Sequence, residues 1–326
     1  MTRSLAILIA VVTIGAGCNS RTTFSSASVL SPGTYDFVLS EVTIDPGGSS
    51  VMTGFNLDGA FTASGDSTGC QKVDRLSSLD PDQNSGGCGP STPSCAGGVD
   101  NQLPAFYDNL DQFPAPDDRP TQRQKLAAAI AAGRITTLVR LSGVDDLQSD
   151  PDVQVALFRA FPTTTDCAHL FDGTGHFVVT SDSVMGSLSA PRWVGSGSIV
   201  EGRLRVVVPA IDDLAGYGGE MPLPVTQVTL RVSLAGDGSG GVYGSVGGWL
   251  ETHTFRKFLV ALLPIWGSPI DVLMGELPDR AAPDGECGGW WFEYAGDISF
   301  GAGFSLKAAT IDGVATSRTA GACGTN

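Results

Sequence analysis

The sequence predicts a mainly β protein, an antiparallel β-sandwich or a partly closed barrel, with a few short helices and a long Asp/Gly/Cys-rich loop. The first observation is the composition: charged residues make up 16% of the chain, and 43 of its 326 residues are glycine. The second is the alternation of apolar and polar residues in segment 225–234, which is typical of a strand with one buried and one wet face. The third is that about eight such segments occur between turn residues.

The segments expected to form strands are short and rich in β-branched and aromatic residues. In the clearest of them, Val228, Leu230 and Val232 share one face, while Thr229 and Arg231 share the other. In chain order the expected strands are 35–44, 135–144, 153–161, 176–180, 203–209, 225–234, 242–250 and 298–306, with a hairpin turn at 236–241.

Helical spacing of apolar residues interrupts the β pattern in four places. Leu103, Phe106 and Tyr107 predict one short helix. Thr121 is expected to cap a second helix, which ends at Gly133. Leu126, Ala127 and Ile130 of the second helix are expected to face inward. A third helix is expected to cover 255–262, before Pro264, and a fourth is expected to begin at Ser268.

The chain begins with a segment typical of an export signal. Arg3 precedes an apolar run, Leu5–Ile14, and small residues at 15–17 lead into Cys18. The run is shorter than the roughly 20 residues that a membrane-spanning helix needs. A cysteine at this position resembles the lipobox of bacterial lipoproteins, so we expect residues 1–17 to be removed and Cys18 to carry the lipid. The alternative is an ordinary secretory signal that is cut elsewhere.

The signal sets the expected organisation of the rest of the chain. Residues 18–33 are rich in serine and threonine and are expected to form a flexible tether. Residues 34–326 then form one β-rich domain, made of an acidic loop segment, 54–118, and a main body, 119–326. The expected location is outside the cytoplasm, lipid-anchored to the bacterial cell envelope at the outer membrane.

The charge balance is strongly acidic, with 19 Lys and Arg against 34 Asp and Glu and a net charge of −15. This charge argues against nucleic acid as a partner. It favours divalent cations or basic partners, although solubility alone also explains it. The expected partners are the membrane, through the lipid anchor, and an unidentified protein or glycan.

Six cysteines follow Cys18. An even number in an exported chain predicts disulfide bonds, whose connectivity the sequence does not define. No two of them form a Cys-x-x-Cys pair, which argues against a zinc or thioredoxin-like site. The disulfide candidates are Cys70, Cys88, Cys95, Cys167, Cys287 and Cys323.

The acidic segment contains a candidate calcium site. Asp80, Asp82 and Asn84 place oxygen-bearing side chains at alternate positions, and two glycines follow. Calcium takes six to eight oxygen ligands, and glycine lets the backbone turn tightly around the ion. The spacing departs from an EF-hand, so the candidate is a looser site to which Asp100 contributes. A solvated loop pinned by disulfides is favoured over this calcium site.

No arrangement of residues supports a catalytic assignment, and none is made. His169, Asp172 and His176 lie close in sequence to Cys167, but their spacing fits no zinc helix, and a turn before a strand is favoured. Ser67 lacks the glycine pattern of a hydrolase nucleophile. A glycosidase needs two carboxylates close together in space. The candidates for such a pair are Asp212, Asp213, Glu220, Glu276 and Glu293.

Five short motifs carry a resemblance to known proteins. They are GFNLDG at 54–59, GC at 69–70, GVDNQL at 98–103, SGVDDL at 142–147 and CGG at 287–289. The combination resembles a set of bacterial surface lipoproteins of uncharacterised function. The resemblance implies export and lipidation and brings no catalytic residues.

The sequence therefore predicts a non-catalytic binding or structural protein of the cell envelope, with calcium as a candidate stabilising ion. The alternative is an extracytoplasmic hydrolase acting on glycan, lipid or peptide.

Overall fold

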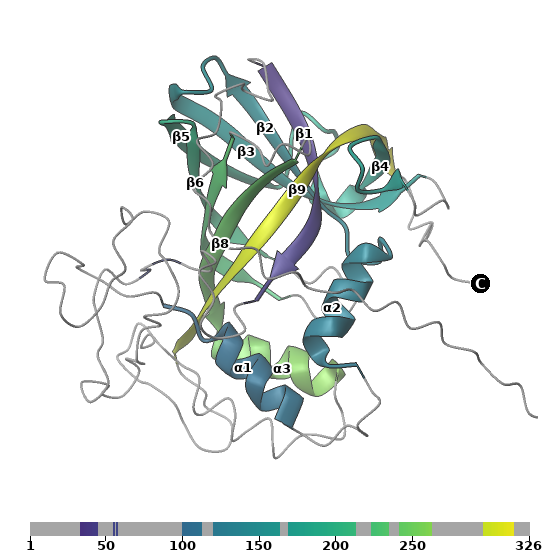
Figure 1. Ribbon diagram of the computed structural model, residues 1–326, viewed down its shortest axis with the longest axis vertical. Coiled ribbons are helices and arrows are strands. Elements are labelled where there is room, and N and C mark those ends of the chain that lie inside the picture. The colour runs from purple at the N-terminus through teal and green to yellow at the C-terminus, as the bar shows by residue number, and fades with distance from the viewer. Residues whose placement is uncertain are drawn as a thin grey trace, which may run out of the picture.

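Eight antiparallel strands close into a barrel, which forms the body of the protein (Figure 1). The computed structural model describes residues 33–44, 55, 57, 100–112, 120–163, 169–212, 223–234, 241–262 and 296–315. In pairing order the barrel strands are β1 (Gly33–Thr43), β2 (Thr137–Val144), β3 (Ser149–Pro162), β5 (Trp193–Val200), β6 (Arg203–Ile211), β7 (Val225–Ser233), β8 (Gly241–Glu251) and β9 (Asp297–Ala315). The predicted β-rich class is confirmed, and the barrel is closed because β9 pairs with both β8 and β1.

Bulges and a close strand approach bend the strands enough to close the barrel. In β1, the register against β9 shifts between Leu39 and Glu41. In β7, Gln227 has a φ of 51° where the register against β8 shifts. In β5, a Cβ atom on Gly197 would lie 1.9 Å from the carbonyl oxygen of Arg205, so β6 can approach only because this residue is glycine.

Strand β5 is the barrel strand that the sequence pattern does not predict. Glycine and serine make up half of its residues, WVGSGSIV, and both give a weak strand signal. A tight hairpin joins it to β6, with Val200 opposite Arg203. Glu201 and Gly202 occupy this turn with φ values of 51° and 72°, as a type I′ turn requires.

A second apolar cluster lies on the outer face of the barrel. Phe37 and Val38 are adjacent in β1 and point to opposite faces, yet their exposed fractions are only 2% and 0%. Phe37 belongs to the core inside the barrel. Val38 packs in an outer cluster with Phe177 of β4 (Gly175–Thr180), a strand that pairs with the ends of β3 and β9. A short 3₁₀ helix, η2 (Ser181–Ser183), follows β4.

Three helices lie at one end of the barrel (Figure 1). They are α1 (Leu103–Gln112), α2 (Gln122–Ala131) and α3 (Thr252–Leu262), which confirms the three helices predicted in these regions. Helices α1 and α3 lie side by side, with the rings of Phe106 and Phe255 5.1 Å apart. No helix among the described residues is long and apolar enough to cross a membrane. The helix predicted from Ser268 lies outside the described residues.

The predicted cap of α2 is confirmed. The hydroxyl of Thr121 accepts a hydrogen bond from the backbone N–H of Gln124, whose side chain accepts one from the N–H of Thr121. The predicted inward face is right for Ile130 and wrong for Ala127, which is exposed while Ala129 is buried. Positions three and four residues apart share one side of a helix, and in α2 that side includes Ala129.

Candidate functional site

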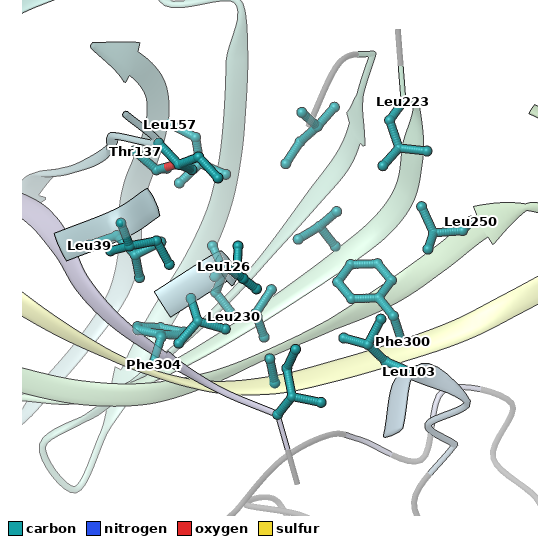
Figure 2. A pocket seen from close by; sticks show the side chains of 18 of the residues that line it. Leu39, Leu103, Leu126, Thr137, Leu157, Leu223, Leu230, Leu250, Phe300 and Phe304 are labelled. Atoms are coloured by element: carbon teal, nitrogen blue, oxygen red, sulfur yellow. The ribbon is translucent and has the colours of Figure 1, made fainter. Parts of the chain in front are cut away.

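The barrel contains a cavity of about 430 Å³ at the end where the helices lie. Figure 2 shows side chains from several strands converging on it. Leu39 of β1, Leu230 of β7 and Phe300 of β9 form part of its wall, and Phe106 of α1 and Phe255 of α3 contribute from the helices. The cavity is therefore bounded by both the barrel and the helices at its end.

Helix α2 forms one side of the cavity. Gln122, Lys125, Leu126 and Ile130 line it, and they follow one face of the helix. Ile130 is buried, with 2% of its surface exposed, whereas Lys125 is exposed. The cavity thus extends along α2 from the interior of the barrel to the surface of the protein.

Arg123 connects α2 to α1 beside the cavity. Its guanidinium donates to the carboxylate of Asp108 at 2.7 Å and to the carbonyl oxygen of Pro104 at 3.1 Å. The same group lies over the ring of Tyr107, 5.4 Å from its centroid. These contacts hold the two helices together where both line the cavity.

The chemical character of the lining is apolar. Most of the described lining residues are leucine, isoleucine, valine or phenylalanine. The polar exceptions are Tyr107, Gln122, Lys125 and Thr137, and Lys125 alone among the described lining residues carries a charge. None of the described lining residues is a histidine, aspartate, glutamate, serine or cysteine. Such a surface binds apolar groups.

Asn101 fixes the start of α1 against β9. It is fully buried, its amide donates to the carbonyl oxygen of Gly301 at 3.0 Å, and its carbonyl oxygen accepts from the N–H of Gly301 at 2.8 Å. The same oxygen accepts from the N–H of Leu103, the first residue of α1, at 3.1 Å. One side chain therefore both pairs with a strand and satisfies the first backbone N–H of the helix that lines the cavity.

Asp100, a predicted calcium ligand, lies at the base of the acidic segment. It is 3% exposed, and its carboxylate accepts a hydrogen bond from the N–H of Leu57 at 2.5 Å. Its own N–H donates to the carbonyl oxygen of Phe55 at 2.9 Å. These bonds join Phe55 and Leu57 to Asp100, so the described ends of this stretch meet.

The other predicted calcium ligands, Asp80, Asp82 and Asn84, lie outside the described residues. Within the described ranges no group of three or more His, Cys, Asp or Glu residues could hold a metal ion. The predicted calcium site therefore stays a prediction. Cys18 and the six cysteines predicted to form disulfides are also outside the described residues.

The two histidines near Cys167 form separate pairs with carboxylates. Nδ1 of His169 lies 2.7 Å from the carboxylate of Asp172, and Nδ1 of His176 lies 2.8 Å from that of Asp312. Hydrogen bonds from the hydroxyl of Thr174 and from His169 lower the pKa of Asp172 to about 2. None of these residues lines the cavity. Asp172 and Thr174 form a hydrogen-bonded turn before β4, in line with the predicted turn.

Asp212 is the one of the five glycosidase candidates that falls among the described residues. Its carboxylate accepts a hydrogen bond from the indole N–H of Trp193 at 2.5 Å and pairs with Arg192. These bonds fix the end of β6 to the start of β5. Asp213, Glu220, Glu276 and Glu293 and the nucleophile candidate Ser67 lie outside the described residues.

The cavity was not predicted from the sequence. Leu230 was predicted as a buried residue and Phe300 falls within a predicted strand; both are buried, but alternation does not show whether the opposing side chains meet. The sequence feature that could have indicated the cavity is in α2, where the polar residues Gln122 and Lys125 lie on the same face as the buried Ile130.

No protein-family model, curated protein or solved structure matches the chain. The resemblance to bacterial surface lipoproteins therefore stays a prediction. The fold and the site define a closed antiparallel β-barrel with an apolar cavity that helix α2 extends to the surface.

Proposed function

We propose that the protein is an envelope-anchored binding protein without catalytic activity, whose barrel holds a small apolar ligand such as an acyl chain. The observation that carries the proposal is the cavity of about 430 Å³ inside the barrel. Small-molecule pockets typically have volumes of about 300–1,000 Å³ and predominantly apolar walls with a few polar groups. The cavity has both properties.

The energetics of an apolar cavity favour an apolar occupant. When the cavity is empty, its walls lose van der Waals contacts, and water finds few hydrogen-bond partners there. Each methylene group moved from water into such a space contributes about 0.8 kcal/mol. A hydrocarbon chain is therefore the occupant that this lining stabilises most.

The envelope part of the proposal rests on the sequence. The apolar run before Cys18 predicts export and lipidation, which would place the barrel beside a membrane. Apolar ligands are concentrated in membranes, so an anchored protein would meet them there. The cavity and the predicted anchor are thus consistent with one role.

The test is binding of a neutral fluorescent apolar probe, N-phenyl-1-naphthylamine, to the purified full chain. We expect saturable binding with enhanced fluorescence. The variant Ala302→Phe fills the cavity from β9, because Ala302 is a buried lining residue between Phe300 and Phe304. We expect it to lower probe affinity at least tenfold.

The matched control is Val207→Phe, which adds an aromatic ring at an exposed position of β6 outside the cavity lining. It should leave probe binding unchanged. Absence of saturable binding by the unmodified protein would overturn the proposal, as would equal binding by Ala302→Phe and the unmodified protein when both are folded by circular dichroism.

A further inference from the structure

We infer that the ligand is a single-chain amphiphile with an anionic head group, such as a fatty acid, with its chain in the barrel and its head at Lys125. This inference rests on the proposed function and adds the chemical class of the ligand. It is built on the distribution of polarity along α2, on the charge at the cavity and on the volume.

The face of α2 that lines the cavity changes from polar to apolar along the helix. Gln122 and Lys125 lie in its first turns, followed by Leu126 and Ile130. Gln122 is half-buried, Lys125 is exposed and Ile130 is fully buried. A molecule lying along this face meets polar groups at the surface and apolar groups inside, which is the order of groups in an amphiphile.

The charge at the cavity favours an anion. The protein has a net charge of −15, yet the charged side chain among the described lining residues is a lysine. No carboxylate among the described residues forms an ion pair with Lys125, whereas the neighbouring Arg123 is paired with Asp108. The N-terminal end of a helix also carries a partial positive charge, and Lys125 is close to that end of α2. The ammonium group and the helix end would both stabilise a carboxylate there.

The volume indicates one chain rather than two. A cavity of about 430 Å³ lies near the lower end of the range of about 300–1,000 Å³ that is typical of small-molecule pockets. A single chain of medium length suits a cavity of that size better than the two long acyl chains of a phospholipid.

Lys125 alone would not retain a free anion. An exposed ion pair contributes up to about 1 kcal/mol, which is about a fivefold effect on affinity. Most of the affinity must therefore come from the chain, and Lys125 would add selectivity for the charged head group.

The experiment measures the affinities of dodecanoate and 1-dodecanol by displacement of N-phenyl-1-naphthylamine from the full chain. For Lys125→Gln we expect the affinity for dodecanoate to fall about threefold to fivefold while the affinity for dodecanol changes less than twofold. Added salt should weaken dodecanoate binding to the unmodified protein and have less effect on the variant. Over a series of shorter fatty acids, affinity should rise about fourfold per methylene until the cavity is full.

The matched control is Lys257→Gln, which removes an exposed lysine of α3 that does not line the cavity. It should bind both ligands like the unmodified protein. The assignment of the head group would be overturned if Lys125→Gln lost affinity for dodecanoate and dodecanol equally, or lost none for dodecanoate. Probe binding would in either case still support an apolar ligand. Failure of the probe and of both amphiphiles to bind would overturn the proposed function as well.

Discussion

Asn101 pairs with Gly301 in the manner of a neighbouring strand, using its side chain instead of its backbone. Its amide group donates to the carbonyl oxygen of Gly301 and accepts from the N–H of the same residue. The described pairing of β9 with β1 reaches Gly303, so Asn101 provides the hydrogen bonds two residues further along β9. Because α1 starts at Leu103, this pair sets where the helix meets the barrel.

Replacing Asn101 with alanine should destabilise the protein by about 2–4 kcal/mol, because the buried N–H and carbonyl groups of Gly301 each lose a partner. The measurement is urea unfolding monitored by circular dichroism. Thr121→Ala removes an exposed helix cap and serves as the comparison, with an expected loss of about 1 kcal/mol. An Asn101→Ala effect no larger than that of Thr121→Ala would contradict a central role for the pair.

Replacing Arg123 with alanine should accelerate exchange of the ligand. The change removes the contacts with Asp108, Pro104 and Tyr107 that hold α1 to α2 beside the cavity. The ion pair is partly exposed, so we expect stability to fall by no more than about 1 kcal/mol. Release of N-phenyl-1-naphthylamine, followed by stopped-flow fluorescence, should become severalfold faster, because α1 and α2 would separate more easily beside the cavity. The control Arg134→Ala alters an exposed arginine outside the cavity, and release rates equal to this control would contradict the expectation.

Acid should weaken the turn between β2 and β3 through Asp150. Backbone N–H groups donate to its carboxylate, that of Asp145 at 2.7 Å and that of Asp152 at 3.1 Å. These bonds, that from Asp145 first, lower the pKa of Asp150 below its ordinary value of 3.8. A lowered pKa in the folded state means that the stabilisation is present above pH 3.8 and is lost as the pH falls through the folded value.

The variant Asp150→Asn tests this pH dependence. At about pH 6 it should be less stable than the unmodified protein. The difference should shrink as the pH is lowered to about 2.5, below the ordinary value of 3.8, because the carboxylate then binds a proton more readily in the unfolded chain than in the folded protein. Urea midpoints of both proteins at the two pH values provide the measurement. A difference that stays constant over this range would show that the carboxylate charge is not involved.

Replacing Gly197 with alanine should destabilise the barrel by about 2–4 kcal/mol. The added Cβ would lie 1.9 Å from the carbonyl oxygen of Arg205 and 2.4 Å from Cγ2 of Val206, so β5 and β6 would have to separate. The neighbouring Ser196→Ala changes an exposed side chain and should shift stability by less than about 0.5 kcal/mol. Thermal unfolding of the two variants measures the contrast, and similar midpoints would argue against a close approach at Gly197.

Local sequence patterns were sufficient to predict most of the elements of the fold. The alternation in β7 placed Val228, Leu230 and Val232 on the buried face, and the structure confirms that they are buried. The prediction that Thr229 lies on the wet face is wrong, because Thr229 is buried too. The helix cap at Thr121 is equally local, since the two residues that form the capping box are three apart. Strand β5 was missed because its glycines are required by contact with β6, a feature that no local propensity records.

The closure of the barrel and its cavity could not be predicted in the same way. Closure depends on pairing of β1 with β9, and such distant pairings leave no periodic signal in the chain. The cavity depends on the volume that opposing side chains leave unfilled, which alternation does not encode. Asn101 illustrates the same limit, since its partner Gly301 is 200 residues away.

The pairing of β1 with β9 also determines when the cavity comes into existence. Phe37 lies opposite Ala308, so the barrel cannot close until β9 has been synthesised. Phe300 and Phe304, which form part of the cavity wall, belong to this last strand. A chain that lacks β9 has no finished compartment, so a ligand could enter the barrel only after β9 has been synthesised.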